Sequence, residues 1–298
     1  MEEFAASVVR GLGVGSTYAL IAVGFVIVYR ATDVVNFAHP ALMILGAYYT
    51  SWFVFNVGLP FWVAVPAAML TMGLLGAICE RVALRPMVGE PPFAAAMVTV
   101  GLFFVLFILA FRLIGTSVIT MGDPWGLERA TILGVRVFQV DLAKTVIALT
   151  AIGVVALFLN RSRVGLAMRA TALDQEVSLA QGVNVGRVFG LSWAIAGATA
   201  GLAGMLVGTG AGGVEPITAL VALKALPVII LGGLDSVEGT VPAGLAIGIA
   251  EALTRTYQPG IAPWLGANFD VVVPYLIMIL VLMLRPYGLF GTPEVQRV

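Results

Sequence analysis

The sequence predicts an all-α, polytopic membrane protein with eight to nine transmembrane helices and with broken or re-entrant segments. Two properties of the composition support this class. Of the 298 residues, 60% are hydrophobic and only 11% are charged, whereas soluble globular domains carry roughly 25% charged residues. The mean hydropathy is +1.04, which leaves too little polar surface to coat a water-soluble particle.

The apolar residues gather in segments long enough to cross a bilayer, whose hydrocarbon core needs roughly 20 apolar residues in a helix. The clearest segment, 93–111, contains no charged residue. The segment 216–231 is short and contains Lys224 and Pro227, so it either spans the membrane or enters and turns back. The other expected spans are 11–29, 34–57, 60–79, 142–159, 188–208, 240–253 and 271–284.

Charge and missing motifs narrow the function. The 16 basic and 16 acidic residues cancel, so nothing indicates a nucleic-acid partner. The chain has no phosphate-binding loop, nucleophile elbow or zinc-protease motif, so we expect neither an enzyme nor a cofactor. The single cysteine excludes an internal disulfide. Any energy for transport would therefore come from a partner or from an ion gradient.

Two loops outside the expected spans have recognisable patterns. Between 116 and 141, a turn at 123–126 precedes alternating apolar residues, which predicts a short hairpin or lid on the outer side. The loop 160–187 lies within a cluster of arginines, and the excess of positive charge in cytoplasmic loops places it on the cytoplasmic side. The acidic start, Glu2 and Glu3, is unlike a cleaved signal peptide, so the first apolar segment is expected to remain as a membrane helix.

Many of the 35 glycines occur four residues apart within the expected spans. Small residues at this spacing let two helix backbones approach closely in lipid. We interpret the pairs first as helix packing within the subunit; a subunit interface or a pathway wall is the alternative. The pairs are Gly11/Gly15, Gly197/Gly201, Gly204/Gly208 and Gly244/Gly248.

Two places interrupt an apolar run with polar or helix-breaking residues. Irregular backbone at membrane depth must face protein or a water-filled cavity, and broken helices often mark a transport path. The alternative is that both are interfacial turns with helix caps, and that His39 makes a structural hydrogen bond. A lone histidine is not expected to hold a metal. The candidate pathway residues are Asn36, His39 and Pro40 in the first break and Gly232, Gly233, Asp235 and Ser236 in the second.

Ionisable residues inside a span should face the protein interior or water. Glu251 lies in the expected span 240–253, and Arg255 follows four residues later on the same helical face. We predict that they form an ion pair, with a pathway role as the second interpretation.

The cytoplasmic loop contains a helix-forming stretch from 169 to 181 whose apolar positions suit one short amphipathic helix. Gly182 suits the left-handed residue that commonly ends a helix. Such a helix would lie parallel to the membrane and could dock into a groove on another protein.

This loop resembles the coupling loop of permeases of ATP-binding-cassette importers. The whole chain resembles the branched-chain amino acid permeases of that class, the hydrophobic amino acid uptake group, and in particular the first of their two permease subunits. The order and spacing of several short motifs carry the resemblance: they lie at 15–20, 35–39, 45–48, 165–170, 182–185, 201–204, 230–234 and 285–291. Pro40 and Asp235 depart from the glycines common in the family.

The resemblance implies one transmembrane permease domain over residues 1–298, in the bacterial inner membrane. It implies a sister permease in a heterodimer or homodimer, two cytoplasmic ATPases and a periplasmic substrate-binding protein. The solute would be a branched-chain amino acid or a related amide, urea or organic acid. A stand-alone ion-coupled transporter is the alternative, suggested by Lys224 and Glu251. The residues implied in ATPase coupling are Arg169, Ala170, Ala172, Asp174, Glu176, Ala180 and Gly182.

Overall fold

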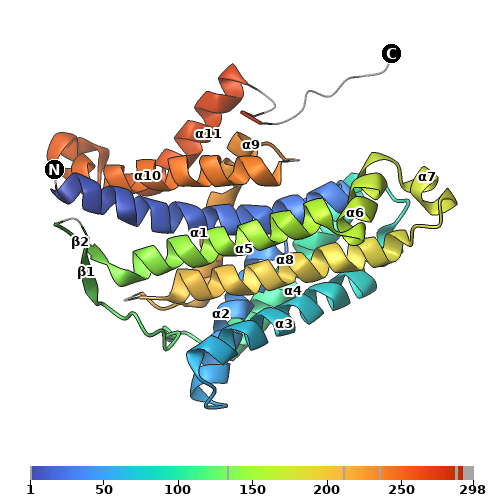
Figure 1. The fold of residues 1–298 in the computed structure, drawn as a ribbon, viewed down its shortest axis with the longest axis horizontal. Helices are drawn as coiled ribbons and strands as arrows, with labels where there is room; N and C mark the ends of the chain where they lie inside the picture. The colour runs from blue at the N-terminus through green and yellow to red at the C-terminus, as the bar shows by residue number, and fades with distance from the viewer. Residues whose placement is uncertain (1, 133, 211, 235, 286–287, 291–298) are drawn as a thin grey trace. The chain divides into compact units, whose positions relative to one another are not determined.

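The computed structural model describes residues 2–132, 134–210, 212–234, 236–285 and 288–290 (Figure 1). The fold is all-helical except for one small hairpin, which confirms the predicted class. Strands β1 (Arg129–Ile132) and β2 (Val135–Phe138) pair antiparallel, with Arg129 opposite Phe138. The hairpin expected between 116 and 141 is therefore confirmed. Asp235, one of the predicted pathway residues, lies outside the described residues.

The helices follow one another with short connections. They are α1 (Glu2–Thr32), α2 (His39–Phe55), α3 (Phe61–Cys79), η1 (Glu80–Leu84), η2 (Arg85–Met87), α4 (Pro92–Ile114), α5 (Gln139–Arg161), α6 (Arg163–Leu173), α7 (Gln175–Ala180), α8 (Val185–Gly208), η3 (Pro216–Lys224), α9 (Ala225–Gly232), α10 (Val237–Ile261), η4 (Pro263–Leu265), η5 (Phe269–Val271) and α11 (Val273–Leu284).

Five helices among the described residues are long and apolar enough to cross a membrane. They are Glu2–Thr32, Phe61–Met87, Pro92–Ile114, Gln139–Arg161 and Val185–Gly208. A sixth span results if Pro216–Gly232 and Val237–Ile261, which bend by 117° at their break, count as one. The predicted count of eight to nine is not confirmed. One reason is that α2 begins only at His39 and has 17 residues, because the residues before it are irregular.

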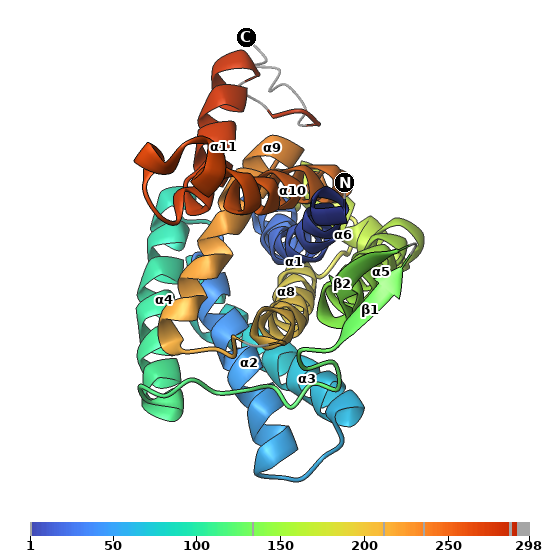
Figure 2. The same ribbon diagram turned by 90° about the vertical axis from the view of Figure 1, so that its left-hand side faces the viewer.

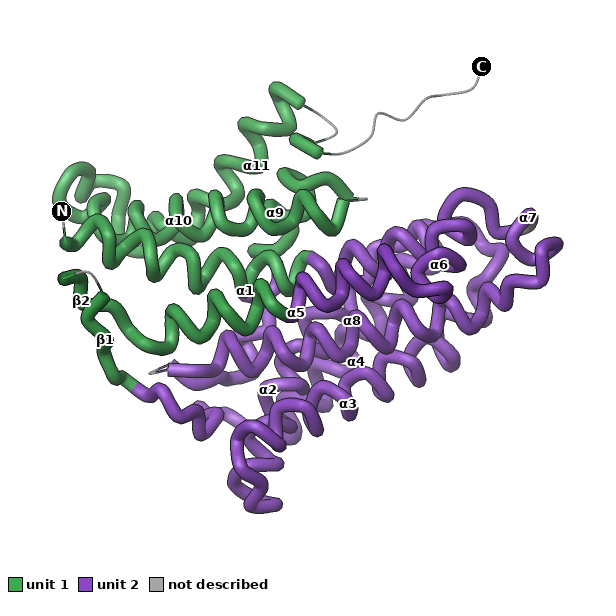
Figure 3. Tube along the Cα trace, viewed as in Figure 1, with its two compact units in different colours: residues 1–22, 127–150, 224–298 green, residues 23–126, 151–223 purple. Residues whose placement is uncertain are grey.

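The described chain forms two compact units (Figure 3). Unit 1 comprises residues 1–22, 127–150 and 224–298, and unit 2 comprises residues 23–126 and 151–223. In unit 2, α8 packs against α2 and α3, as Figure 2 also shows. In unit 1, α10 packs against α9 and α11.

Glycines bring the helix backbones together inside each unit. In unit 1, Gly15 of α1 lies against Gly244 and Gly248 of α10, so that a methyl group at any of the three would overlap backbone atoms. In unit 2, Gly197 and Gly204 of α8 lie against the carbonyl groups of Met72 and Met43. These contacts confirm the interpretation that the glycine pairs serve helix packing within the subunit. Helices in lipid lack a hydrophobic driving force for association, so dispersion contact between closely packed backbones holds them together.

A matched pair of glycine variants tests this packing. We expect Gly248→Ala to lower the free energy of unfolding by roughly 1–3 kcal/mol, because its methyl group would overpack against α1. Gly153→Ala on α5 should leave stability unchanged or slightly raised, because no described atom lies within 4 Å of the added carbon. Thermal unfolding in detergent measures both. Equal midpoints for the two variants would contradict the packing role.

Candidate functional site

The first break, between α1 and α2, is a capped turn. The Asn36 side-chain oxygen accepts the N–H of Ala38 at 3.0 Å, and the Asn36 carbonyl accepts the N–H of His39 at 3.2 Å. Pro40 stands in the first turn of α2, where a missing N–H costs no helical hydrogen bond. Pro40 therefore begins a helix here instead of kinking one.

Helix α4 holds the irregular backbone of this break. The Thr99 hydroxyl accepts the N–H of Phe37 at 3.0 Å, and its oxygen lies 3.2 Å from the carbonyl of Val35 and 2.8 Å from that of Ala96, to which it can donate. Thr99 is fully buried. One side chain from another helix thus supplies hydrogen bonds that water would otherwise provide, which is the condition for irregular backbone at membrane depth.

His39 and Asn36 are both fully buried beside this turn. The His39 imidazole lies on the backbone of Gly24 and its ring centroid is 4.6 Å from that of Phe25. The amide nitrogen of Asn36 has no hydrogen-bond partner among the described residues. A buried donor without a hydrogen-bond acceptor costs roughly 1–3 kcal/mol of folding free energy. A ligand that offers an acceptor to this nitrogen would recover that cost. The hydrogen bond expected for His39 stays a prediction.

The second break, between α9 and α10, is also a capped turn. The Ser236 hydroxyl accepts the N–H of Gly239 at 2.9 Å and caps α10. Gly233 has a φ of 91°, a conformation that favours glycine, and the backbones of Gly232 and Gly239 touch. Ser236 is therefore the N-cap residue of α10. The two breaks belong to different units, each held together by its own contacts.

The loop 160–187 forms two helices, where the sequence predicted one. Asp174 ends α6 by donating its N–H to the carbonyl of Ala170, and its carboxylate then accepts the N–H of Val177 at 2.9 Å to cap α7. An aspartate that can serve as an N-cap favours a new helix start over continuation. Gly182, with a φ of 81°, ends α7 as predicted.

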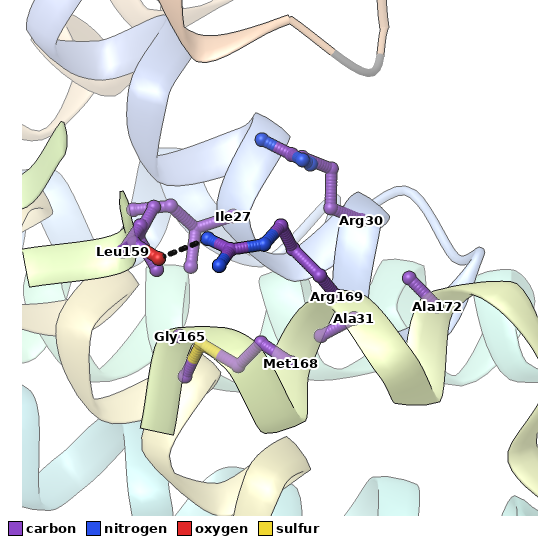
Figure 4. A pocket seen from close by; sticks show the side chains of 8 residues that line it. All are labelled: Ile27, Arg30, Ala31, Leu159, Gly165, Met168, Arg169 and Ala172. Carbon is purple, nitrogen blue, oxygen red and sulfur yellow. Dashed lines mark hydrogen bonds between the residues drawn. The ribbon is translucent and has the colours of Figure 1, made fainter. Parts of the chain in front are cut away.

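Arg169 turns inward, toward α5. Its guanidinium donates to the carbonyl of Leu159 in the last turn of α5 (Figure 4), where a cation meets the negative end of the helix dipole. The cavity beside it, lined also by Met168 and Ala172, has a volume of about 20 Å³, room for about one water molecule. Arg169 therefore fixes α6 on α5.

Four large apolar side chains are exposed on these two helices. Leu173 is 89% exposed, and Leu166, Val177 and Leu179 are each more than half exposed. We call these four residues the α6–α7 surface. It lies outside the candidate spans α5 and α8. Ala180 is exposed beside it and Ala170 is partly buried, while the side chain of Glu176 lies outside what the structure describes.

Unit 1 contains a network of four charged residues, in which the carboxylates of Glu251 and Asp270 are buried and Arg255 is exposed. Glu251 pairs with Lys224 at 2.7 Å and accepts the Tyr18 hydroxyl at 3.1 Å. Arg255 pairs with Asp270 at 2.6 Å and lies 3.7 Å from Glu251. The predicted Glu251–Arg255 pair is confirmed, yet Lys224 is the nearer partner of the carboxylate. Two positive and two negative charges balance, as buried charges require.

Sequence reasoning missed Tyr18 and Asp270 in this network. Tyr18 and Glu251 are 233 residues apart, so no helical spacing links them. A rule that matches every ionisable residue in an apolar segment with an opposite charge elsewhere would have found Lys224 and Asp270 as candidates.

The fold and these sites define a multi-pass helical membrane protein in which side-chain hydrogen bonds support the backbone of the membrane breaks. The family model for the permease component of branched-chain amino acid transport systems matches residues 7–282, and the chain belongs to this family. It is a transport permease, which is not an enzyme class.

The relatives cover nearly the whole chain. The high-affinity branched-chain amino acid transport system permease protein LivH of Escherichia coli is 29% identical over 97% of this chain and 96% of its own length. The permease protein BraD of Pseudomonas aeruginosa is 30% identical with the same coverage. A probable branched-chain amino acid transport permease, LivH of Methanocaldococcus jannaschii, is 26% identical over 91% of this chain and 88% of its own.

One solved structure shares the fold. It is described as PsaBC from Streptococcus pneumoniae in complex with Fab, and it aligns with a TM-score of 0.53 over 95% of this chain and 92% of that chain. At 13% sequence identity the likeness concerns the fold alone.

The charged network yields a stability prediction. Lys224→Met leaves Glu251 with only the more distant Arg255 as a countercharge, and we expect a loss of about 3 kcal/mol, as when one partner of a buried ion pair is removed. The double variant Lys224→Met/Glu251→Gln should recover at least half of that loss, because the uncompensated charge is gone. Thermal unfolding measures both.

The exposed carboxylate of Glu128 in the same unit provides the control, and Glu128→Gln should leave the midpoint unchanged. A double variant no more stable than Lys224→Met would show that the network does not hold unit 1 together through charge pairing.

Proposed function

We propose that this chain is one permease subunit of an ATP-binding-cassette importer in the bacterial inner membrane. The solute is a branched-chain amino acid or a related small amide, urea or organic acid. The assembly contains a sister permease, identical or related, two cytoplasmic ATPases and a periplasmic substrate-binding protein. Family membership supports the transport role, and the α6–α7 surface supports the coupling to a second protein.

The α6–α7 surface is the observation that carries this proposal. Monomeric proteins rarely expose contiguous apolar patches unless a partner covers them. Leu173 and Val177 flank the cap formed by Asp174 and are both exposed, so each of the two helices presents an apolar side chain next to their junction. An amphipathic helix laid in a groove of a partner is a recurring mode of recognition. The ATPase is the partner that a permease without a phosphate-binding loop needs.

The coupling residues then have distinct tasks. Arg169 links α6 to the end of α5, so a displacement of α6 acts directly on a membrane span. Asp174 fixes the angle between α6 and α7 through its two backbone hydrogen bonds. Gly182 lets the chain turn from α7 toward α8. In this proposal the apolar side chains of the α6–α7 surface contact the ATPase. Arg169 and Asp174 hold the helices that carry those side chains in place.

The stand-alone, ion-coupled alternative receives less support. Its motivating residues, Lys224 and Glu251, pair with each other at 2.7 Å, and the network around them is balanced. A proton-relay or ion site needs a group free to change its charge or its ligand during the cycle. The named relatives are permease proteins of branched-chain amino acid transport systems, which favours the importer.

Charged substitutions on the α6–α7 surface test the coupling. We expect Leu173→Glu/Val177→Glu to abolish co-purification of the ATPases and to lower uptake at least about tenfold, because losing about 1.4 kcal/mol of interface free energy already weakens binding tenfold. The protein should still insert and fold, because both side chains are exposed.

The matched control is Leu127→Glu, an exposed leucine outside the spans near the hairpin. Its uptake and ATPase association should equal those of the wild type. Normal ATPase association in the Leu173→Glu/Val177→Glu variant would remove the α6–α7 surface from the coupling interface.

The buried amide of Asn36 is proposed to serve the solute pathway, together with His39 and Pro40. The side-chain oxygen has a structural task, so a useful variant keeps an oxygen acceptor and removes the amide nitrogen. Asn36→Ser does both, because a serine hydroxyl can accept the Ala38 N–H in the same type of turn. We expect uptake to fall about tenfold while the thermal midpoint changes little, as one lost hydrogen bond to a charged group is worth about 1.5–3 kcal/mol.

The control is Asn56→Ser, at the exposed C-terminal end of α2, and this variant should transport normally. If Asn36→Ser takes up solute with unchanged kinetics, the break is a capped turn and nothing more. Gly232, Gly233, Asp235 and Ser236 are proposed as the second element of the pathway.

A further inference from the structure

Two arginines from different helices line the small cavity beside Arg169 (Figure 4). Arg30 lies in the last turn of α1, and Arg169 of α6 reaches the last turn of α5. Both α1 and α5 are candidate spans, so this Arg30–Arg169 cavity lies at the ends of two membrane-crossing helices. All of its lining residues belong to unit 2.

The charge of this cavity is positive. No carboxylate in the described part of the chain pairs with either guanidinium group, and the lining residues include none. The nearest carboxylate after Arg169 in the sequence is that of Asp174, which caps α7 instead. Arg169 donates to the Leu159 carbonyl, but a guanidinium group carries five N–H donors. Both arginines therefore keep donors for an anion.

The general preference of basic residues for one side of a membrane does not account for these two positions. Arg161 and Arg163, in the same connection, are exposed, as such residues usually are. Arg30 and Arg169 are only partly exposed, and they line the cavity together with buried apolar side chains such as Met168. A charge held against apolar surface costs free energy unless an opposite charge pairs with it. The cavity therefore favours an anionic ligand.

The size and surroundings of the cavity select the kind of anion. It has room for about one water molecule, so most of a ligand must lie outside it. Guanidinium groups bind phosphate through pairs of parallel hydrogen bonds. Leu157 and Phe158, which directly precede Leu159 on α5, are exposed and offer apolar surface to hydrocarbon chains. A phosphate group at the rim and an apolar body along α5 describe a phospholipid, and basic pockets between transmembrane helices suit anionic head groups.

We propose that the rim of the Arg30–Arg169 cavity binds the phosphate of an anionic phospholipid, whose acyl chains lie along the exposed side of α5. The phosphate accepts hydrogen bonds from both guanidinium groups and so links the end of α1 to α6. It thereby reinforces the hydrogen bond from Arg169 to Leu159. The binding itself goes beyond the proposed function. Its consequence for coupling rests on that function, since it assumes that α6 meets an ATPase.

Scintillation-proximity binding of radiolabelled dioleoylphosphatidylglycerol to the full chain in detergent micelles tests the proposal. We expect saturable binding that unlabelled dioleoylphosphatidylglycerol displaces. Dioleoylphosphatidylcholine, which has the same chains but no net charge, should not displace it. Arg30→Gln should weaken binding about fivefold, the contribution of one arginine near an anionic surface, and salt should weaken binding by screening.

A second variant and a matched control accompany Arg30→Gln. Arg169→Gln should also weaken binding about fivefold, and its thermal midpoint without lipid measures separately the loss of the hydrogen bond to Leu159. Arg187→Gln removes an exposed arginine from the first turn of α8 in the same unit and should bind like the wild type.

Three outcomes would overturn the proposal. Equal displacement by the two lipids would show that the cavity does not recognise the anionic charge. Equal weakening in Arg187→Gln and Arg30→Gln would reduce the binding to general attraction by basic residues. Full displacement by millimolar inorganic phosphate would make the cavity a site for a soluble anion. Because this assay uses the permease alone, its failure is distinct from a failure of the α6–α7 surface, which is read from ATPase association and uptake.

Discussion

Backbone hydrogen bonding inside the membrane is the constraint on which the rest of this structure depends. Every N–H and C=O that leaves a helix at membrane depth needs a partner within the protein. Thr99 supplies it for the first break, Ser236 for the second and Arg169 for the end of α5. Each of these side chains also fixes the neighbouring element in space. Positions that look like interruptions in the sequence are therefore the points where helices are joined to one another.

Glycine packing and charge pairing both follow from the lipid environment, which offers helices no polar partners of its own. Helices in lipid gain little from burying apolar surface against each other, so close backbone contact and paired charges must hold them. In unit 1, Gly15 and Gly248 bring α1 against α10, and the same two helices contribute Tyr18 and Glu251 to the charged network. Close approach at the glycines thus sets the distance over which the hydroxyl and carboxylate meet. The glycine contacts and the Tyr18–Glu251 hydrogen bond therefore hold the same two helices, α1 and α10, together.

The parts that could be predicted from the sequence are those governed by local rules. Apolar length identified α1, α3, α4, α5 and α8, and spacing identified the glycine contacts, the hairpin and the Gly182 helix end. The structure departs from the prediction where several local options compete. At Asp174, helix propensity favours continuation and a capping carboxylate favours a restart, and the restart prevails. At Pro40, the residue could kink a helix or begin one, and the preceding turn decides for the beginning.

The contacts that escaped prediction join residues distant in the sequence. Thr99 meets the first break across 62 residues, and Arg85 reaches the carbonyl of Gly186 across 101. No periodicity encodes such a pair, because each partner is satisfied only once the helices are assembled. The candidate site is therefore harder to foresee than the fold. The sequence located the two breaks and the helical loop 160–187, but not the side chains that hold their backbone in place.

Unit 2 places the candidate pathway and the candidate coupling element near a second cavity, of about 270 Å³. The wall of that cavity includes Val34, two residues before Asn36 in the first break, and Gln175 at the start of α7. Arg85 neutralises the buried Glu80 of η1 and also donates a hydrogen bond to the Gly186 carbonyl. It therefore links η1 to the first turn of α8. The residues that line this cavity therefore come from η1, α7 and the end of α1 together. On the proposed coupling, a displacement of α7 by the ATPase would act through this shared wall on the residues next to Asn36.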